Sequence, residues 1–330
     1  MSTIEPAKAH VELEHPHARP LTACHWDPLG RYVFFGAEDY GVHRFDVATK
    51  TAVPLMAHDS WVRGLGCSPS GEQLYSGGYD GRLVWWPAAA EKPEPIRVVD
   101  AHRGWIRELA VSPVGELVAS CGNDNLVKLW NATDGSQVHE FSGHESHVYN
   151  VAFSPNGESL VSCDLHGKLK AWDLKSGKLQ RDLGAAEALY LYDKSFLADI
   201  GGARCMNFRS DGNQVAVGGI TKVTNAFAGI GEAVVVLVEA ESGKVARQLE
   251  AKEKVHGTTW GIAHHSQGLW VGVAGGGGGG WLYFWNEEGE PQEIFKLKLK
   301  SPGRGMSLAA DGLRVAVAHS DNHLRIYSLV

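Results

Sequence analysis

The chain has 330 residues, of which 44% are hydrophobic and 21% are charged, and it contains 40 Gly and 11 Trp. This composition is typical of a globular protein with many turns and β-strands, and long helices are not expected. The formal net charge of −7 argues against nucleic acid as a partner, because affinity for nucleic acid comes largely from Lys and Arg side chains that neutralise phosphates.

The sequence shows no sign of export or of membrane insertion. Its first twenty residues contain no apolar stretch that could form the core of a signal peptide, and no later segment resembles a membrane span. The five Cys are scattered singly, at Cys24, Cys67, Cys121, Cys163 and Cys205. We therefore expect reduced cysteines in a cytoplasmic protein, with no membrane partner and no cofactor.

The strongest signal is an internal repeat. A Gly that closes a turn containing Pro or Asp returns seven times, at Gly30, Gly71, Gly115, Gly157, Gly212, Gly268 and Gly312. Most intervals between these glycines are about 41 to 44 residues, the length of a four-stranded propeller blade. The two intervals beside Gly212 are each about ten residues longer, so inserted segments are expected in the second half.

The first predicted strand precedes the first repeat. Residues His10 to Glu14 alternate apolar Val11 and Leu13 with polar neighbours, as a half-buried strand does. The last repeat, residues 306–330, ends at its third strand and would leave an unpaired edge. We expect the N-terminal segment to become the missing outer strand and to close a ring.

Repeats two to four show the unit most clearly, as AHDSWVRGLGCSPSGEQLYSGGYDGRLVWW, AHRGWIRELAVSPVGELVASCGNDNLVKLW and GHESHVYNVAFSPNGESLVSCDLHGKLKAW. Each alternates short β-branched and apolar stretches with turns that carry Ser-Pro-x-Gly and Asp-Gly or Asp-Asn. Pro presets φ in such turns, and Gly or Asn tolerates a positive φ. Each unit is therefore predicted to be a run of strands joined by tight turns.

Longer connections are predicted further along the chain. Residues Ala186 to Gly202 should join repeats four and five, and Gly219 to Ala233 should join the second and third strands of repeat five. The run Gly275 to Gly280 is expected to be a flexible turn rather than a phosphate-binding nest, because alternating aromatic residues follow it as in a strand. All three connections should leave from one face. Residues 294–300, IFKLKLK, are predicted to be an outer strand whose exposed lysines discourage aggregation.

At these positions the sequence resembles the WD-repeat family. Gly-His or Ala-His opens each unit, and Trp followed by Asp or a substitute closes its third strand, as at Trp130-Asn131 and Trp172-Asp173. The resemblance spans essentially the whole chain and implies an all-β fold, a single seven-bladed β-propeller over residues 1–330 that is monomeric on its own. The segments AGGGGGGWLYFW and GITKVTNAFAGIGEAVVVL look like parts of uncharacterised bacterial, planctomycete-like WD-repeat proteins.

Three repeats carry His, Ser and Asp at equal spacing. The sets are His58, Ser76 and Asp80; His102, Ser120 and Asp124; and His144 and Ser162, with His166 where Asp is expected. A hydrolase triad uses these residue types, but an enzyme needs one such site, whereas a blade needs the same polar network each time. The resemblance implies that Trp86, Trp130 and Trp172 complete these networks, and no catalytic residue is predicted.

Other repeats depart from this arrangement. Repeat one has Phe35 and Phe45 where Ser and Trp belong, so His17 and Asp39 lack two partners, and repeats five to seven lack the network almost wholly. The nearest candidates for metal binding are His15 with His17, His264 with His265, and the region from His319 to His323. None has a known ligand spacing, so no metal site is predicted.

The residues that begin the innermost strands form a distinctive set. They are Thr22, Arg63, Arg107, Tyr149, Arg204, Trp260 and Arg304, with Trp61 and Trp105 two positions earlier. Innermost strands line the channel of a propeller, so these side chains should surround its mouth. Arg and aromatic residues are enriched at binding hot spots, and Arg pairs bidentately with carboxylates. The alternative is that each Arg bonds a neighbouring blade or nearby Asp59 and Glu108.

Two functions are compatible with this sequence. The favoured one is a non-catalytic scaffold that binds a partner protein, through an acidic segment, on the loop face around the channel mouth. The alternative is a propeller that binds a small ligand, or hydrolyses one, at the same place. Catalysis would need a unique polar cluster, and the sequence contains no nucleophile elbow, metal triad or unmatched carboxylate pair, so no enzyme is predicted.

Overall fold

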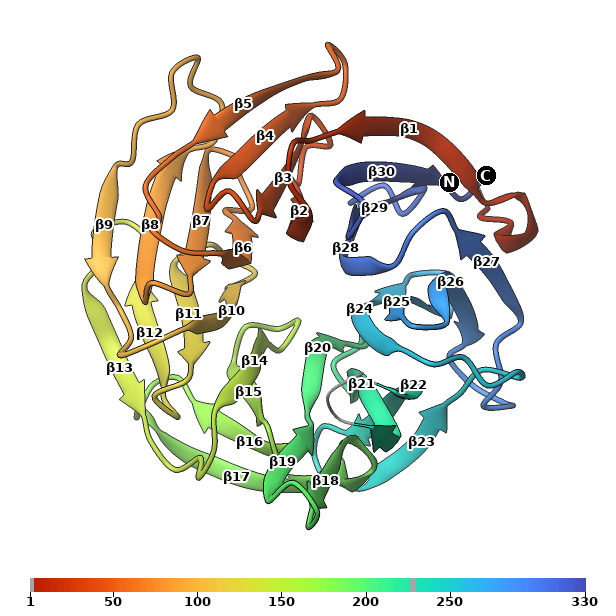
Figure 1. Ribbon diagram of the computed structural model, residues 1–330. Helices are drawn as coiled ribbons and strands as arrows, with labels where there is room; N and C mark the ends of the chain where they lie inside the picture. The colour runs from red at the N-terminus through yellow and green to blue at the C-terminus, as the bar shows by residue number, and fades with distance from the viewer. Residues whose placement is uncertain (1–2, 226–229) are drawn as a thin grey trace.

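The computed structural model describes residues 3–225 and 230–330. Over these ranges the chain forms seven four-stranded antiparallel sheets arranged as blades around a common centre (Figure 1). A two-stranded sheet lies outside this ring of blades. The described residues contain no α-helix, only the 3-10 turns η1 (Pro6–Lys8) and η2 (Glu187–Leu189). The all-β fold and the seven blades are as the sequence predicts.

The first four blades each take four consecutive strands, ordered from the innermost to the outermost. Blade one contains β2 (Leu21–Trp26), β3 (Tyr32–Ala37), β4 (Val42–Asp46) and β5 (Thr51–Leu55). Blade two contains β6 (Val62–Cys67), β7 (Gln73–Gly78), β8 (Arg82–Pro87) and β9 (Arg97–Asp100). Blade three contains β10 (Ile106–Val111), β11 (Leu117–Gly122), β12 (Val127–Asn131) and β13 (Gln137–Phe141). Blade four contains β14 (Val148–Phe153), β15 (Ser159–Asp164), β16 (Lys168–Asp173) and β17 (Lys178–Ala185).

The remaining blades follow the same order except at the end of the chain. Blade five contains β20 (Ala203–Phe208), β21 (Gln214–Asn225), β22 (Ile230–Glu239) and β23 (Val245–Leu249). Blade six contains β24 (Thr258–His265), β25 (Leu269–Gly276), β26 (Gly279–Asn286) and β27 (Phe295–Leu299). Blade seven contains β28 (Gly303–Leu308), β29 (Arg314–His319), β30 (His323–Ser328) and, as its outer strand, β1 (His10–Pro16). The extra sheet is the hairpin of β18 (Tyr190–Asp193) and β19 (Ala198–Gly201).

The seven repeated glycines share one conformation. Each ends the turn between the first two strands of its blade, and their φ angles all lie between 68° and 79°. A residue with a Cβ rarely adopts this left-handed conformation, so the turn requires Gly. The glycines therefore recur in the sequence because each blade needs a positive φ at the same place in its first turn.

Apolar faces of adjacent blades form the core. Between blades seven and one, for example, Val33 and Phe35 pack in one cluster with Ala316 and Ile326. Blades one and two share a comparable cluster around Phe34. Each blade therefore covers its neighbour, and the ring is complete only when blade seven meets blade one.

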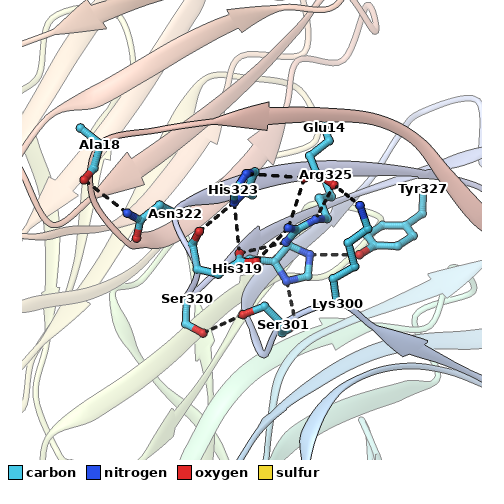
Figure 2. Close-up of polar contacts among 11 residues, drawn as sticks. Glu14, Ala18, Lys300, Ser301, His319, Ser320, Asn322, His323, Arg325 and Tyr327 are labelled. Atoms are coloured by element: carbon cyan, nitrogen blue, oxygen red, sulfur yellow. Dashed lines mark hydrogen bonds and ion pairs between the residues drawn. The ribbon is translucent and has the colours of Figure 1, made fainter.

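The N-terminal strand closes the ring, as predicted. Strand β1 pairs antiparallel with β30 from His10 opposite Ser328 to Pro16 opposite His323. Figure 2 shows the side chains that reinforce this pairing: Arg325 donates from Nε to Glu14 Oε2 at 2.9 Å, and Lys300 donates to the same oxygen at 2.8 Å. Backbone bonds extend the contact at both ends, from Glu5 to Leu329 at 2.8 Å and from His17 to Asn322 at 2.7 Å.

Glu14 gives the closure a dependence on pH. Hydrogen bonds from Arg325 and Lys300 lower the pKa of Glu14 to about 2 from its usual 4.5. A carboxyl group whose pKa is lower in the folded state stabilises the fold above its unfolded pKa, and the contribution is lost as pH falls through the folded value. The Glu14 contribution is therefore complete above about pH 4.5 and disappears between there and about pH 2.

The predicted connections in blades four to six have more regular structure than expected. Residues 219–233 were expected to be a loop, but β21 continues to Asn225 and β22 begins at Ile230, so every described residue of the segment lies in a strand. Residues 226–229 lie outside the described ranges. The β-branched alternation of the segment explains this extension. Residues 186–202 form η2 and the β18–β19 hairpin, which Figure 1 shows at the outer edge of the ring.

The glycine run forms a turn, as expected. The turn is shorter than predicted and consists of Gly277 and Gly278 alone, because Gly275 and Gly276 end β25 and pair with Gly280 and Gly279 of β26. Gly278 donates a backbone bond to His256 at 2.8 Å. His256 also bridges to Glu232 of β22, so the hairpins of blades five and six are neighbours. The predicted lysine-rich outer strand is β27.

Candidate functional site

Blades two, three and four each contain one chain of side-chain hydrogen bonds. In blade two, His58 Nδ1 lies 3.1 Å from Asp80 Oδ2, and His58 Nε2 lies 2.8 Å from Ser76 Oγ. Trp86 Nε1 donates to the same Ser76 oxygen at 2.8 Å. These bonds agree when Nδ1–H donates to Asp80 and the Ser76 hydroxyl donates to Nε2. The chain thus links the loop before β6 to β7, β8 and the turn between them.

The other two blades repeat this geometry. In blade three, His102 contacts Asp124 at 2.8 Å and Ser120 at 2.7 Å, and Trp130 donates to Ser120 at 2.9 Å. In blade four, the corresponding distances are 2.9 Å from His144 to Asp164, 2.7 Å from His144 to Ser162 and 2.8 Å from Trp172 to Ser162.

The expectation that His166 replaces the acid of blade four is wrong. Asp164, two residues earlier, pairs with His144 at 2.9 Å. Asp164 ends β15, so its carboxylate reaches the position that Asp80 and Asp124 reach from the following turn. Equal spacing among the three sets predicts an acid at position 166, so Asp164 lies two residues before the expected place.

The three serine side chains cannot reach a substrate. Ser76, Ser120 and Ser162 each have 0% exposure, and each hydroxyl is used by a His and a Trp. A nucleophile must be accessible and free to attack. These chains therefore favour a structural role, in which buried polar groups satisfy one another.

We predict that Asp80→Ala and Asp124→Ala each destabilise the fold. Either change leaves a buried His without its partner, which costs roughly 1 to 3 kcal/mol. Chemical denaturation of both variants measures this cost. Unchanged unfolding curves in both would contradict the network, and Asp134→Ala, in an exposed turn, serves as the control.

The residues expected at the channel mouth share a backbone feature that the sequence did not reveal. In every blade the register between the first and second strands shifts at one residue, and that residue is the predicted rim residue. They are Thr22, Arg63, Arg107, Tyr149, Arg204, Trp260 and Arg304. A β-bulge re-aims the side chain that it carries. The seven bulges therefore give one residue per blade an equivalent position at the mouth.

These seven side chains line one cavity of about 360 Å³, together with Trp61 and Tyr79. We call this set of nine the rim. Tyr79 is a rim residue that no sequence signal predicts: it lies in the turn after β7 and stacks on Trp105, with ring centroids 4.3 Å apart and an interplanar angle of 2°. Trp105 is predicted for the site but does not line the cavity, and it contacts the rim through Tyr79 and Arg107. Trp61 and Trp105 are 39% and 43% exposed.

Aromatic rings hold the guanidinium groups of the rim in place. Arg107 lies over Tyr149 at 4.4 Å and over Trp105 at 4.7 Å, and it donates from Nε to Asn123 at 2.7 Å. Arg204 also lies over the ring of Tyr149, at 4.7 Å from its centroid. Cation–π contacts of this kind fix a cation without neutralising it. The rim therefore keeps its positive charge.

The alternative, that the rim arginines are neutralised within the protein, holds for one of them. Arg304 pairs with Glu38 at 2.6 Å. Among the described residues, Arg63, Arg107 and Arg204 form no ion pair, and Asp59 pairs instead with Arg82 at 2.7 Å. Three of the four guanidinium groups are thus available to an anion.

The pKa of Arg204 is consistent with an excess of positive charge in the rim. Burial lowers the pKa of Arg204, and the nearby charges of Arg107 and Arg63 lower it further. Deeper in the channel, Glu108 lines a second cavity of about 500 Å³. Burial raises the pKa of Glu108 to about 7, against the opposing effect of Arg63. Near neutral pH, Glu108 therefore carries only part of a negative charge, and it offsets the positive charge of the rim only in part.

The histidines considered for metal binding lie in separate places. His264 pairs with Glu287 at 2.8 Å, and His323 lies 3.5 Å from Glu14 in the closure of blade seven. His17 pairs with Asp39 at 2.8 Å in blade one. The five cysteines are free and buried.

Seven antiparallel blades with a shared central site define the class of β-propellers. Three segments, residues 49–87, 93–131 and 135–173, match the WD domain, G-beta repeat family WD40. Each matched segment contains one complete network of His, Asp, Ser and Trp. The repeats and the seven blades together support a WD-repeat β-propeller. The search of curated proteins finds no match, and no helix in the described ranges is long and apolar enough to cross a membrane.

Proposed function

We propose that the protein is a non-catalytic scaffold whose rim captures an acidic segment of a partner protein. WD40 propellers are generally protein-interaction scaffolds. The observation that carries the proposal is the placement of four arginines around one cavity, three of them without an ion-paired carboxylate among the described residues. Carboxylates of a binding partner would form ion pairs with these three guanidinium groups.

The composition of the rim suits a protein segment. Arg, Trp and Tyr are the residues most enriched at binding hot spots. In the rim, the aromatic side chains provide apolar contact area, and the guanidinium groups orient an anionic partner. The rim lies on a protein with net charge −7, so its positive charge is a local feature that would steer an acidic segment to the channel mouth.

The alternative of a small ligand or a hydrolysed substrate at the channel mouth has less support. The repeated Ser hydroxyls are buried and fully bonded, and WD40 propellers are generally not enzymes. We further propose that the protein is monomeric on its own and acts in a reducing cytoplasm, since its cysteines are unpaired. We also propose a bacterial source, because two segments of the sequence resemble parts of planctomycete-like WD-repeat proteins.

Site-specific photo-crosslinking tests the proposal. A photoreactive phenylalanine analogue at Tyr149 places the probe in the rim, and the same analogue at Val138 of outer strand β13 is the control. The Tyr149 probe should capture partner segments rich in Asp and Glu that the Val138 probe does not. Identical products from both positions, or basic segments at Tyr149, would refute the proposal.

A further inference from the structure

Blade one contains a polar cluster unlike those of blades two to four. His17 Nε2 lies 2.8 Å from Asp39 Oδ2, and His43 Nε2 lies 3.1 Å from the same oxygen. The three ligand-type atoms of these residues all lie within 4.8 Å of one another. In the described ranges this is the one such group of three His, Cys, Asp or Glu side chains.

The orientation of His17 differs from that of its counterparts. In the other three blades the His presents Nδ1 to the acid and gives Nε2 to a Ser. In blade one, Phe35 replaces that Ser and contacts both imidazoles, edge-on to His17 at 5.4 Å and stacked on His43 at 5.0 Å. As a result, both Nε2 atoms converge on one carboxylate.

His43 is an addition to the blade rather than part of the repeat. It pairs across the sheet with Phe35. The residues at the same place in the next three blades are Val84, Lys128 and Lys170. The buried network explains a His and an Asp in blade one, but it does not explain a second His aimed at the same acid.

The backbone leaves room beside the three side chains. A Cβ on Gly41 would lie 2.8 Å from His43 Nε2 and 3.3 Å from Asp39 Oδ1, which is too close to the imidazole for a real side chain. Gly41 also donates its backbone N–H to Asp39 at 3.1 Å, which orients the carboxylate. The absence of a side chain at Gly41 therefore lets His43 Nε2 and the Asp39 carboxylate lie this close to the backbone.

We propose that His17, Asp39 and His43 bind one divalent transition-metal ion of the Zn²⁺ type. Two imidazole nitrogens and one carboxylate oxygen are a donor set that suits Zn²⁺, whereas Ca²⁺ and Mg²⁺ prefer oxygen ligands throughout. The two Nε2 atoms and the Asp39 carboxylate already lie close enough together to share one ion. A water molecule would complete a four-coordinate site.

The position of the cluster indicates what the ion would do. His17 directly follows the closing strand β1, whereas Asp39 and His43 belong to blade one. An ion held by all three would link the closing strand to the blade beside it, at the seam of the ring. It would stabilise the folded protein because the unfolded chain has no preformed site.

Calorimetric titration of the chelator-stripped, full-length protein with Zn²⁺ tests this proposal. We expect one equivalent to bind, the melting temperature to rise with Zn²⁺, and His43→Val to weaken binding at least about a hundredfold. Gly41→Ala should also weaken it. Asp80→Asn, which alters the ordinary network of blade two, should leave Zn²⁺ binding unchanged.

Co²⁺ provides a second readout, because its visible spectrum reports the ligands directly. The wild type and Asp80→Asn should show the absorption of a four-coordinate site, and Asp39→Asn should lose it. Equal Zn²⁺ stoichiometry and affinity in wild type and a folded His43→Val variant would overturn the proposal, as would the absence of binding to the stripped wild type.

Discussion

Deletion of residues Met1 to Glu14 should open the ring and cause aggregation, or a melting temperature lower by more than about 10 °C. The deletion removes most of β1 together with the buried side chain of Ile4 and the Glu14 ion pairs. Blade seven would then expose the unpaired edge of β30 and an apolar face. Differential scanning calorimetry and size-exclusion chromatography measure both effects.

Two point variants separate the contributions to this effect. Leu13→Asp keeps the β1 backbone but places a charge against the core between blades seven and one, so it should reproduce much of the loss. Glu12→Gln changes an exposed side chain of the same strand and should have no effect. A truncated protein that stays monomeric and equally stable would show that β1 does not close the ring.

The fold could be predicted because its requirements repeat. Seven glycines are needed at a positive φ in seven equivalent turns, and one polar network recurs in three blades. The closing strand was predictable because an unpaired edge must be covered. Single features were harder: Asp164 lies outside the expected spacing, and the sequence cannot show that a strand extension replaces a loop in blade five.

The site could be predicted only where its residues recur at equivalent positions of the repeats. Alignment of the repeats placed one residue from each blade at the mouth, and the structure brings those seven together. The β-bulges that aim them have no signature in one sequence, and Tyr79 belongs to a turn rather than to a strand. The convergence of His17 and His43 on Asp39 depends on a ring orientation that spacing does not determine.

Replacement of Arg63, Arg107 and Arg204, the three rim arginines without an ion pair among the described residues, with Ala together should abolish recovery of the partner and leave the fold intact. A hot-spot side chain contributes about 2 kcal/mol or more, and every 1.4 kcal/mol is a factor of ten in affinity. Loss of three such side chains would take binding below detection even if their effects are not additive. Whatever binding is left should depend less on salt, because charge pairs carry the salt dependence.

A second triple variant controls for charge. The control variant replaces three arginines of outer strands with Ala: Arg97 of β9, Arg181 of β17 and Arg247 of β23. These residues lie away from the rim, and their replacement removes the same number of positive charges as the rim variant. This control variant should recover the partner as the wild type does. Circular dichroism and thermal melting confirm that both variants are folded.

Quantitative affinity purification with these two variants and the wild type tests the central claim most directly. If the rim captures an acidic segment, the wild type and the outer-strand variant will recover the same partners, and the folded rim variant will recover none of them. Recovery of those partners by the rim variant, at the wild-type level and with the same salt dependence, would contradict the claim.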